Sequence, residues 1–224
     1  MFPTVPSVTP EPPDRLPRGP HHLAREVVLA SQRGRLLAAM AEAVAAKGYA
    51  ASTVADVIAR AGVSRKTFYE HFADKEECFL AAYDAGVDLL LGTLGEAGGD
   101  AQDPVAEVRL RTRAYLEALA SEPAFARTFL IEVTGAGPRA LERRDRVHER
   151  FAQMLRDQVA VARERFPEIP EQPPEVHLAA VGATDLLVSR LIGQGREGEL
   201  AGLEDVIVRI QLALLTAPAP APAP

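Results

Sequence analysis

One short stretch of this 224-residue sequence gathers basic, hydroxyl and imidazole side chains on one side of an expected helix. On that side stand Arg65, Lys66, Thr67, Tyr69 and His71. Guanidinium, ammonium and hydroxyl groups donate hydrogen bonds to phosphate oxygens, and arginine or lysine also pairs with base edges in a major groove. These residue types at this spacing therefore indicate nucleic-acid binding.

Two short helices and a tight turn would position these side chains. The apolar face of the first helix follows an i, i+3, i+4, i+7 pattern, formed by Val54, Val57, Ile58 and Ala61. Thr53 and Asp56 are spaced as a capping box, in which a hydroxyl and a carboxylate satisfy the free N–H groups at a helix start. Gly62 then ends the helix, because glycine adopts a positive φ without steric cost.

The second helix begins after Ser64, which we expect to cap it, and it buries Phe68 and Phe72 at i and i+4. This arrangement predicts a helix-turn-helix whose second helix enters a major groove. We expect phosphate contacts from Thr53, Tyr69, His71 and Lys75. The start of the second helix, with Ser64, Arg65, Lys66 and Thr67, is best placed for the base edges.

The same stretch resembles the TetR family of transcriptional regulators, whose pattern is roughly T-V-x-x-I-A-x-x-A-G-V-S-x-x-T-x-Y-x-H-F-x-x-K-E. The matching residues are Thr53-Val54, Ala61-Gly62-Val63-Ser64, Thr67, Tyr69, His71-Phe72 and Lys75-Glu76. The usual Ile-Ala pair is replaced by Val57-Ile58. The resemblance implies a homodimer that a small-molecule ligand releases from DNA, and two helix-turn-helix units on a twofold axis imply a palindromic operator of double-stranded DNA.

Charge is divided unevenly along the chain. Residues 1–75 carry ten Lys and Arg against seven Asp and Glu, a net charge of +3. Residues 76–224 carry fifteen against twenty-four, a net charge of −9. A basic N-terminal part on an acidic remainder lets one end approach phosphates while the rest is repelled.

Prolines, glycines and capping residues divide the chain into helices, and no alternating strand pattern interrupts them. We expect an all-α fold of about nine helices, with a three-helix DNA-binding unit and a six-helix body. The expected domains are a disordered, basic arm (1–30), the helix-turn-helix domain (31–75), a ligand-binding and dimerisation domain (76–216) and an Ala-Pro tail (217–224). Basic residues of the arm could reach DNA, although an ordinary solvated tail is an equal alternative.

The last two expected helices, about 175–192 and 199–216, are apolar around most of their circumference. Such helices must be buried on most sides. A second copy of the chain could cover the outer side and form a four-helix interface, whereas in a monomer the two helices would lie at the centre of the fold. The resemblance also implies a homodimer through these helices.

Ligand-binding residues are harder to identify. His148 lies on the apolar stripe of the expected helix 138–166, together with Phe151, and is either a polar anchor in a pocket or a hydrogen-bonded core histidine. The same cavity could include Tyr115, Phe125, Arg127 and Phe129.

Other functions find little support in the sequence. Gly193 to Gly198 match G-x-G-x-x-G, but a dinucleotide site needs that motif directly after a strand. The five histidines and Cys78 lack metal-ligand spacing, so we expect no metal, no cofactor and no enzyme activity. One cysteine, no signal peptide and no apolar run of about 18 residues favour a cytoplasmic protein without a membrane partner.

The sequence therefore predicts a ligand-responsive, DNA-binding transcriptional regulator, and favours a repressor. The alternatives are a helical protein-interaction module, or a small-molecule-binding protein that does not bind DNA. DNA affinity that falls steeply with salt concentration would separate the first prediction from both alternatives.

Overall fold

The computed structural model describes residues 32–97 and 103–218. Within these ranges all regular structure is helical, as predicted, with nine α-helices and two 3-10 helices. The first four are α2 (Gln32–Ala51), α3 (Val54–Ala61), α4 (Arg65–His71) and α5 (Lys75–Ala97). The others are α6 (Pro104–Ser121), α7 (Pro123–Leu130), η1 (Glu132–Gly135), α8 (Pro138–Arg165), α9 (Pro174–Gly193), η2 (Glu197–Leu203) and α10 (Glu204–Leu215). The expected arm (1–30) and most of the Ala-Pro tail lie outside the described residues.

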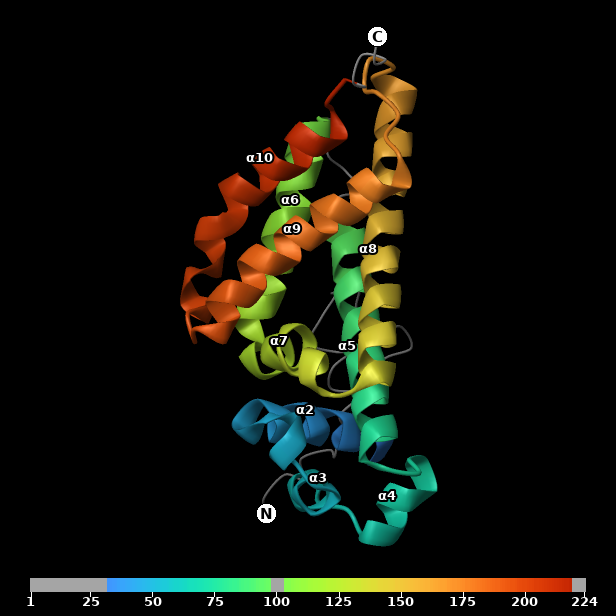
Figure 1. Ribbon diagram of the computed structural model, residues 1–224, viewed down its shortest axis with the longest axis vertical. Coiled ribbons are helices and arrows are strands. Elements are labelled where there is room, and N and C mark those ends of the chain that lie inside the picture. The colour runs from blue at the N-terminus through green and yellow to red at the C-terminus, as the bar shows by residue number, and fades with distance from the viewer. Residues whose placement is uncertain (1–31, 98–102, 219–224) are drawn as a thin grey trace, which may run out of the picture.

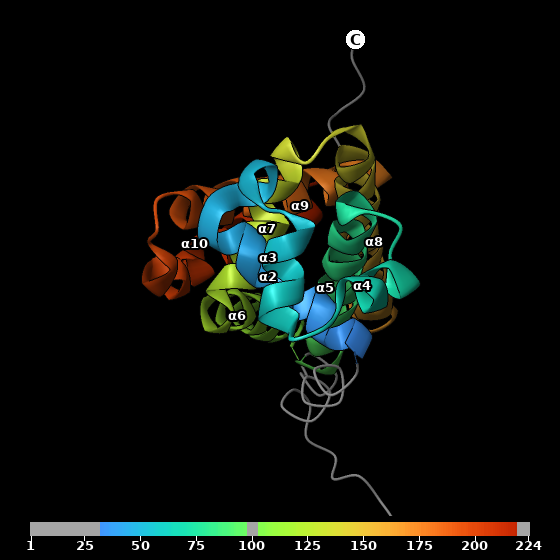
Figure 2. The same ribbon diagram turned by 90° about the horizontal axis from the view of Figure 1, so that it is seen from below.

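The three N-terminal helices lie together at one end of an elongated molecule (Figure 1). α5 and α8 run side by side along the long axis, and α6, α9 and α10 lie beside them, farther from that end. Seen from below, α2, α3 and α4 form the nearest layer (Figure 2). We call α2–α4 the head and α5–α10 the body.

Several helix ends differ from the sequence expectation. α2 is broken at Gly48, as its glycine predicts, but one more turn follows to Ala51. The glycines from Gly95 onward predict a loop after about Leu94, but α5 continues to Ala97, since glycine weakens a helix without ending it. The helix expected from Pro123 to about Gly135 ends at Leu130, and the one expected from about 199 begins at Glu204, because a 3-10 turn replaces the adjoining part of each. Apolar patterning cannot separate α from 3-10 turns, which explains these last two differences.

The core extends from the head into the body along α5. Phe68 of α4, Phe72 directly after α4, and Phe79 and Tyr83 of α5 are all buried. Cys78 is also buried, and burial raises the pKa of its thiol to about 12. The thiol is therefore protonated at neutral pH and is part of the packing between α5 and α2.

Two helices, α5 and α9, are long and apolar enough to cross a membrane by length and composition alone. Neither stood out as an apolar run in the sequence, because single charged residues interrupt them. Those charges pair with arginines of α8: Asp84 with Arg143 at 3.0 Å, Asp88 with Arg150 at 2.7 Å, and Asp185 with Arg144 at 2.9 Å. These interrupting carboxylates thus attach both helices to α8.

Candidate nucleic-acid interface and ligand cavity

Local hydrogen bonds build the turn between α3 and α4. The Thr53 hydroxyl accepts from the backbone N–H of Asp56 at 3.2 Å, and the Asp56 carboxylate accepts from the N–H of Thr53 at 2.8 Å, so the predicted capping box is present. Gly62 ends α3 with φ 62° and ψ 39°. Ser64 caps α4 by accepting from the N–H of Thr67 at 3.0 Å. The head therefore has the predicted helix-turn-helix.

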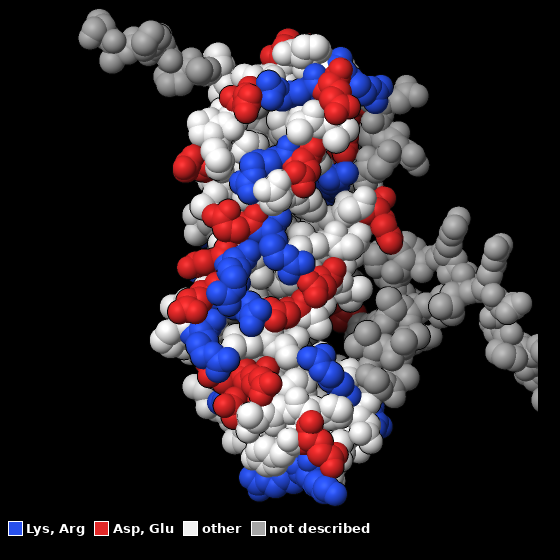
Figure 3. Space-filling model, turned by 90° about the vertical axis from the view of Figure 1, so that its right-hand side faces the viewer, with Lys and Arg blue, Asp and Glu red and all other residues white. Residues whose placement is uncertain are grey.

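α4 turns one side into the head and the other to solvent. Phe68 is fully buried and lies 5.8 Å, centroid to centroid, from the ring of Phe72. Arg65 and Lys66 are exposed, and Tyr69 keeps 49% of its surface exposed. Figure 3 shows Lys and Arg side chains at this end of the molecule. The exposed cations predicted to contact DNA are thus accessible from outside.

Within α4, the exposed side chains make only weak contacts. The Arg65 guanidinium carbon lies 5.9 Å from the centroid of the Tyr69 ring. Lys66 Nζ lies 3.8 Å from the Glu70 carboxylate, in an exposed pair that stabilises little. Thr67 and His71 are half-buried beside them. These groups can therefore turn toward a polyanion at low cost.

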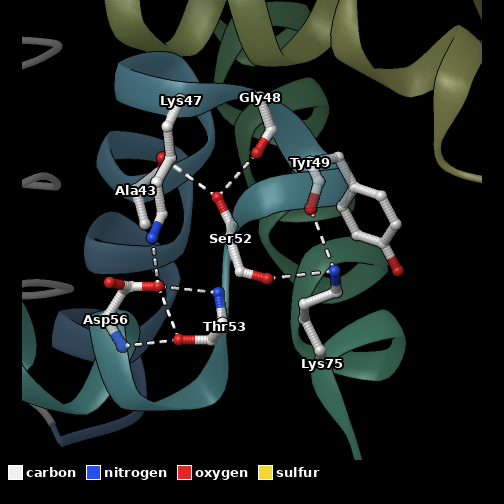
Figure 4. A network of polar contacts seen from close by, with 8 residues as sticks. All are labelled: Ala43, Lys47, Gly48, Tyr49, Ser52, Thr53, Asp56 and Lys75. Atoms are coloured by element: carbon white, nitrogen blue, oxygen red, sulfur yellow. Dashed lines mark hydrogen bonds and ion pairs between the residues drawn. The ribbon is translucent and has the colours of Figure 1, made fainter.

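A polar network joins the end of α2 to the start of α3 (Figure 4). Ser52 is buried, and its hydroxyl lies 2.8 Å from the carbonyl oxygen of Gly48 and 3.1 Å from that of Ala43. Lys47 Nζ lies 2.6 Å from the Asp56 carboxylate. The hydrogen bonds from Lys47 and Thr53 lower the pKa of the Asp56 carboxyl, which stays ionised at neutral pH. The network holds α3 against α2.

Lys75 belongs to the same network. Its ammonium donates to the carbonyl oxygens of Tyr49 at 2.9 Å and Ser52 at 3.0 Å, and the side chain is half-buried. Two of its three donors are therefore used within the chain. Of the residues to which we assigned phosphate contacts, Lys75 is the one whose ionic group faces the backbone.

A cavity of about 670 Å³, including its opening to solvent, lies in the body among α5–α10. Four of the six predicted ligand-binding residues line it: Tyr115, Phe129, His148 and Phe151. The other apolar lining includes Leu94, Val108, Met154, Leu155, Val181 and Ile207. The lining also carries polar side chains, namely Arg111, Thr112, Gln158, Thr184, Asp185 and Gln211. An apolar wall that includes placed polar groups is typical of a small-molecule site.

The other two predicted ligand residues lie outside the lining. Phe125 packs its ring on Gly86 of α5, where a Cβ atom in place of the glycine hydrogen would be only 1.7 Å from Cε2 of the ring. Arg127 faces Glu132, with Nε 3.6 Å from Oε1. The rings of Phe125 and Phe129 stay in contact, with centroids 5.4 Å apart, but Phe125 lies over Gly86 and only Phe129 reaches the cavity lining.

The charged groups in the cavity wall are compensated by other protein groups. Asp185 pairs with Arg144 at 2.9 Å and lies 3.8 Å from Nε2 of His148. Arg111 pairs with Glu107 at 2.8 Å. Desolvation lowers the pKa of His148, so that its ring is neutral at pH 7, and raises the pKa of the Tyr115 hydroxyl. The wall is therefore close to electrically neutral.

Two charged residues of the wall, Asp185 and Arg111, were not predicted from the sequence. Asp185 is one of two charged residues in the last eighteen positions of α9, and an isolated charge in an apolar helix is a usable signal. Arg111 gives no such signal, since its i, i+4 pairing with Glu107 is typical of any exposed helix.

The described part of the chain is thus an all-helical protein of two parts: a helix-turn-helix head and a helical body that contains a cavity. Residues 36–82 match the family described as bacterial regulatory proteins, tetR family. The helix-turn-helix segment of this chain thus matches the TetR family, as its residues predicted.

One curated relative is the HTH-type transcriptional activator FasR of Mycolicibacterium smegmatis, which is 32% identical to this chain over 105 residues. The match spans 47% of this chain and 46% of that protein, so about half the length of each is covered.

Solved structures share the fold over more than four fifths of this chain, at low sequence identity. The fatty acid degradation regulator FadR from Bacillus halodurans superposes with a TM-score of 0.73 at 16% identity, over 83% of this chain and 95% of that one. FadR from Bacillus subtilis, solved in complex with stearoyl-CoA, gives a TM-score of 0.71 at 16% identity, over 83% and 98%. PfmR from Thermus thermophilus gives 0.61 at 21% identity, over 86% and 100%. At these sequence identities the similarity establishes a shared fold alone.

Proposed function

We propose that this protein is a DNA-binding transcriptional regulator that acts as a homodimer and is controlled by a small molecule bound in the body. The exposed basic side of α4, at the far end of the molecule from α10, carries this proposal. Arg65, Lys66 and Thr67 reach the base edges, while Thr53, Tyr69 and His71 contact phosphates. For Lys75 we propose a bracing role instead, because its ammonium already binds two carbonyls.

The homodimer is proposed to form through α9 and α10. In α9, only 22% of the most apolar eighteen-residue segment is buried within one chain. Leu186 is 70% exposed and Val206 is 39% exposed. A second copy that packs these helices into a four-helix interface would remove this surface from water. Two heads related by a twofold axis then match a palindromic operator.

The effector is proposed to be an amphiphile with a long apolar chain, such as an acyl thioester. Half of the lining residues are apolar and the charged groups of the wall already have partners, so an additional unpaired carboxylate inside would be costly. The similar fold of a regulator solved with stearoyl-CoA supports this choice. On this proposal the acyl chain enters the cavity and the charged part of the ligand stays at the opening.

Control would work through the affinity for DNA. A ligand that binds more tightly to a dimer whose heads no longer fit successive major grooves favours release from the operator. The sequence favoured a repressor, whereas the relative in M. smegmatis is named an activator. Binding of one regulator to its operator can repress or activate transcription, because the effect depends on where the operator lies relative to the promoter. A regulator of this kind would act in the cytoplasm, without a membrane partner or enzyme activity.

Selection of bound sequences from random double-stranded DNA tests the proposal. We expect a palindrome whose half-sites are about 34–36 Å apart, or a multiple of that distance. Affinity for the selected duplex should fall steeply with salt concentration. If no sequence is retained above background, or if the affinity does not depend on salt, DNA binding is contradicted. The protein-interaction module and the small-molecule-binding protein would then remain as the alternative functions.

A further inference from the structure

The backbone at Tyr49 is held from two sides by residues far away in the sequence. Gly48, with φ 80° and ψ 159°, interrupts α2, so Tyr49 begins a new turn and its N–H has no acceptor in the preceding helix. The Glu132 carboxylate of η1 accepts this N–H at 2.9 Å. On the other side, Lys75 donates to the Tyr49 carbonyl at 2.9 Å.

The turn fixed in this way leads directly into the helix-turn-helix. Ser52 closes it by hydrogen bonding back to Gly48, and Thr53 begins the cap of α3 (Figure 4). A change in the direction of the chain at Gly48 therefore changes the position of α3 relative to the body. Glycine is favoured here because φ is positive, and a Cβ at this position would also lie only 3.2 Å from Oε2 of Glu132.

The segment that carries Glu132 also forms part of the cavity wall. Phe129, three residues earlier, lines the cavity and stacks on Tyr83 of α5 with centroids 5.1 Å apart. Its neighbour Thr128 faces the other way, with its hydroxyl 3.2 Å from the carbonyl oxygen of Ala41 in α2. α7 therefore contacts both the cavity, through Phe129, and α2 of the head, and η1 follows α7 directly and also contacts α2. Figure 1 shows α7 next to α2.

We propose that Glu132 is the positioning residue through which occupancy of the cavity reaches the DNA-binding head. A ligand that displaces Phe129 moves α7 and η1 and lengthens the bond from Tyr49 N–H to Glu132. Hydrogen bonds weaken steeply with distance and misalignment, so a small shift releases the turn at Gly48. This inference rests on the proposed function, because it assumes that a ligand in the cavity changes DNA affinity.

The first experiment measures this coupling in full-length protein. Stearoyl-CoA is the probe, and the duplex obtained by selection is the DNA. Fluorescence anisotropy gives the DNA affinity with and without probe for the wild type, Glu132→Ala and Thr134→Ala. Thr134 is the matched control, because it is exposed in the same turn and its hydroxyl bonds only to Ile131 of that turn.

We expect stearoyl-CoA to lower the DNA affinity of the wild type and of Thr134→Ala by the same factor, at least tenfold. In Glu132→Ala that factor should shrink at least fivefold, while calorimetry shows stearoyl-CoA binding to the DNA-free protein within twofold of the wild type. An unchanged factor in Glu132→Ala would overturn the inference. Failure of the wild type to bind stearoyl-CoA would instead contradict the proposed effector.

A second measurement needs no ligand. Hydrogen exchange at residues 49–61 is followed in Phe129→Leu, Glu132→Ala and the double variant. Both single variants should exchange at least fivefold faster there, and the double variant should exchange no faster than Glu132→Ala, since both changes act through one bond. If the double variant exchanged faster by the product of the two single factors, Phe129 would influence the head independently of Glu132, and the inference would be overturned.

Discussion

The ammonium of Lys75 and the backbone of Tyr49 form one joint between α5 and the end of α2. Lys75 Nζ lies 2.9 Å from the Tyr49 carbonyl oxygen and 4.1 Å from the centroid of its ring, so a hydrogen bond and a cation–π contact act together. The Tyr49 ring in turn packs on Phe79 of α5, with centroids 4.7 Å apart. The head is thus attached to the body by the first residues of α5.

Lys75→Met should lower stability while leaving the electrostatics of DNA binding nearly unchanged. The methionine keeps the apolar stem but removes the donor, and we expect a loss of about 1.5–3 kcal/mol in the free energy of unfolding, as for hydrogen bonds to charged groups. Urea unfolding measures this loss. The slope of log affinity against log salt should stay within experimental error of the wild type, and a slope smaller by about one unit would instead assign Lys75 to a phosphate.

Arg65→Ala and Lys66→Ala should change DNA recognition without changing stability. Both side chains are exposed on α4, so their removal exposes no core. Each substitution should relax the base preference at one position of the operator, at a cost of about 1–3 kcal/mol. Competition between the selected duplex and single-base variants provides the measurement. Equal losses for every sequence would mean that these side chains contact phosphates.

Gly86→Ala should destabilise the protein although alanine favours helices. At Gly86 the new Cβ would overlap the Phe125 ring, and overpacking of this kind costs about 1–3 kcal/mol. We expect this cost to exceed the gain in helix propensity, which is about 1 kcal/mol. Gly92 is the matched control on α5, because no atom lies within 4 Å of its Cβ position. The urea midpoint should fall for Gly86→Ala and rise for Gly92→Ala. A rise in both would show that Phe125 packs elsewhere.

Leu186→Glu should convert the proposed dimer to a monomer. Leu186 is the most exposed large apolar residue among those described, and a carboxylate there would be buried without a partner between two copies of α9. Val161→Glu is the control, since Val161 is exposed on α8 and its replacement should leave the dimer intact. Sedimentation equilibrium gives the mass of each. A dimeric Leu186→Glu variant would place the interface elsewhere.

Glu204 should stabilise the contact between α10 and α6 only above acidic pH. Its carboxylate accepts from Arg109 and Arg113 at 2.9 Å each, and these hydrogen bonds lower its pKa to about 2 from an ordinary value of 4.5. Because the folded-state pKa is depressed, the stabilisation is complete above about pH 4.5 and is lost as pH falls toward 2.

The test compares the wild type with Glu204→Gln by urea unfolding at pH 7, 5, 4 and 3. The wild type should be more stable by about 1 kcal/mol at pH 7, a modest value because solvent screens the pair. The difference should shrink between pH 4 and 3. A difference independent of pH would show that Glu204 contributes by packing.

The sequence by itself determined the helix-turn-helix and the all-helical class. The capping box at Thr53, the left-handed Gly62 and the cap at Ser64 depend on residues at most four positions apart, so their effect can be predicted without knowing the fold. The helix boundaries at Pro104, Pro123 and Pro138 have the same local origin.

Only the tertiary structure decided which side chains meet across the molecule. Phe125 and Phe129 share one face of α7, yet one packs on Gly86 and the other lines the cavity. The ammonium of Lys75, for which the sequence predicts a phosphate contact, donates to the backbone carbonyl of Tyr49. The carboxylate that accepts the N–H of Tyr49 comes from Glu132, more than eighty residues away. Such contacts depend on how several helices pack at once, and no local pattern in the chain encodes them.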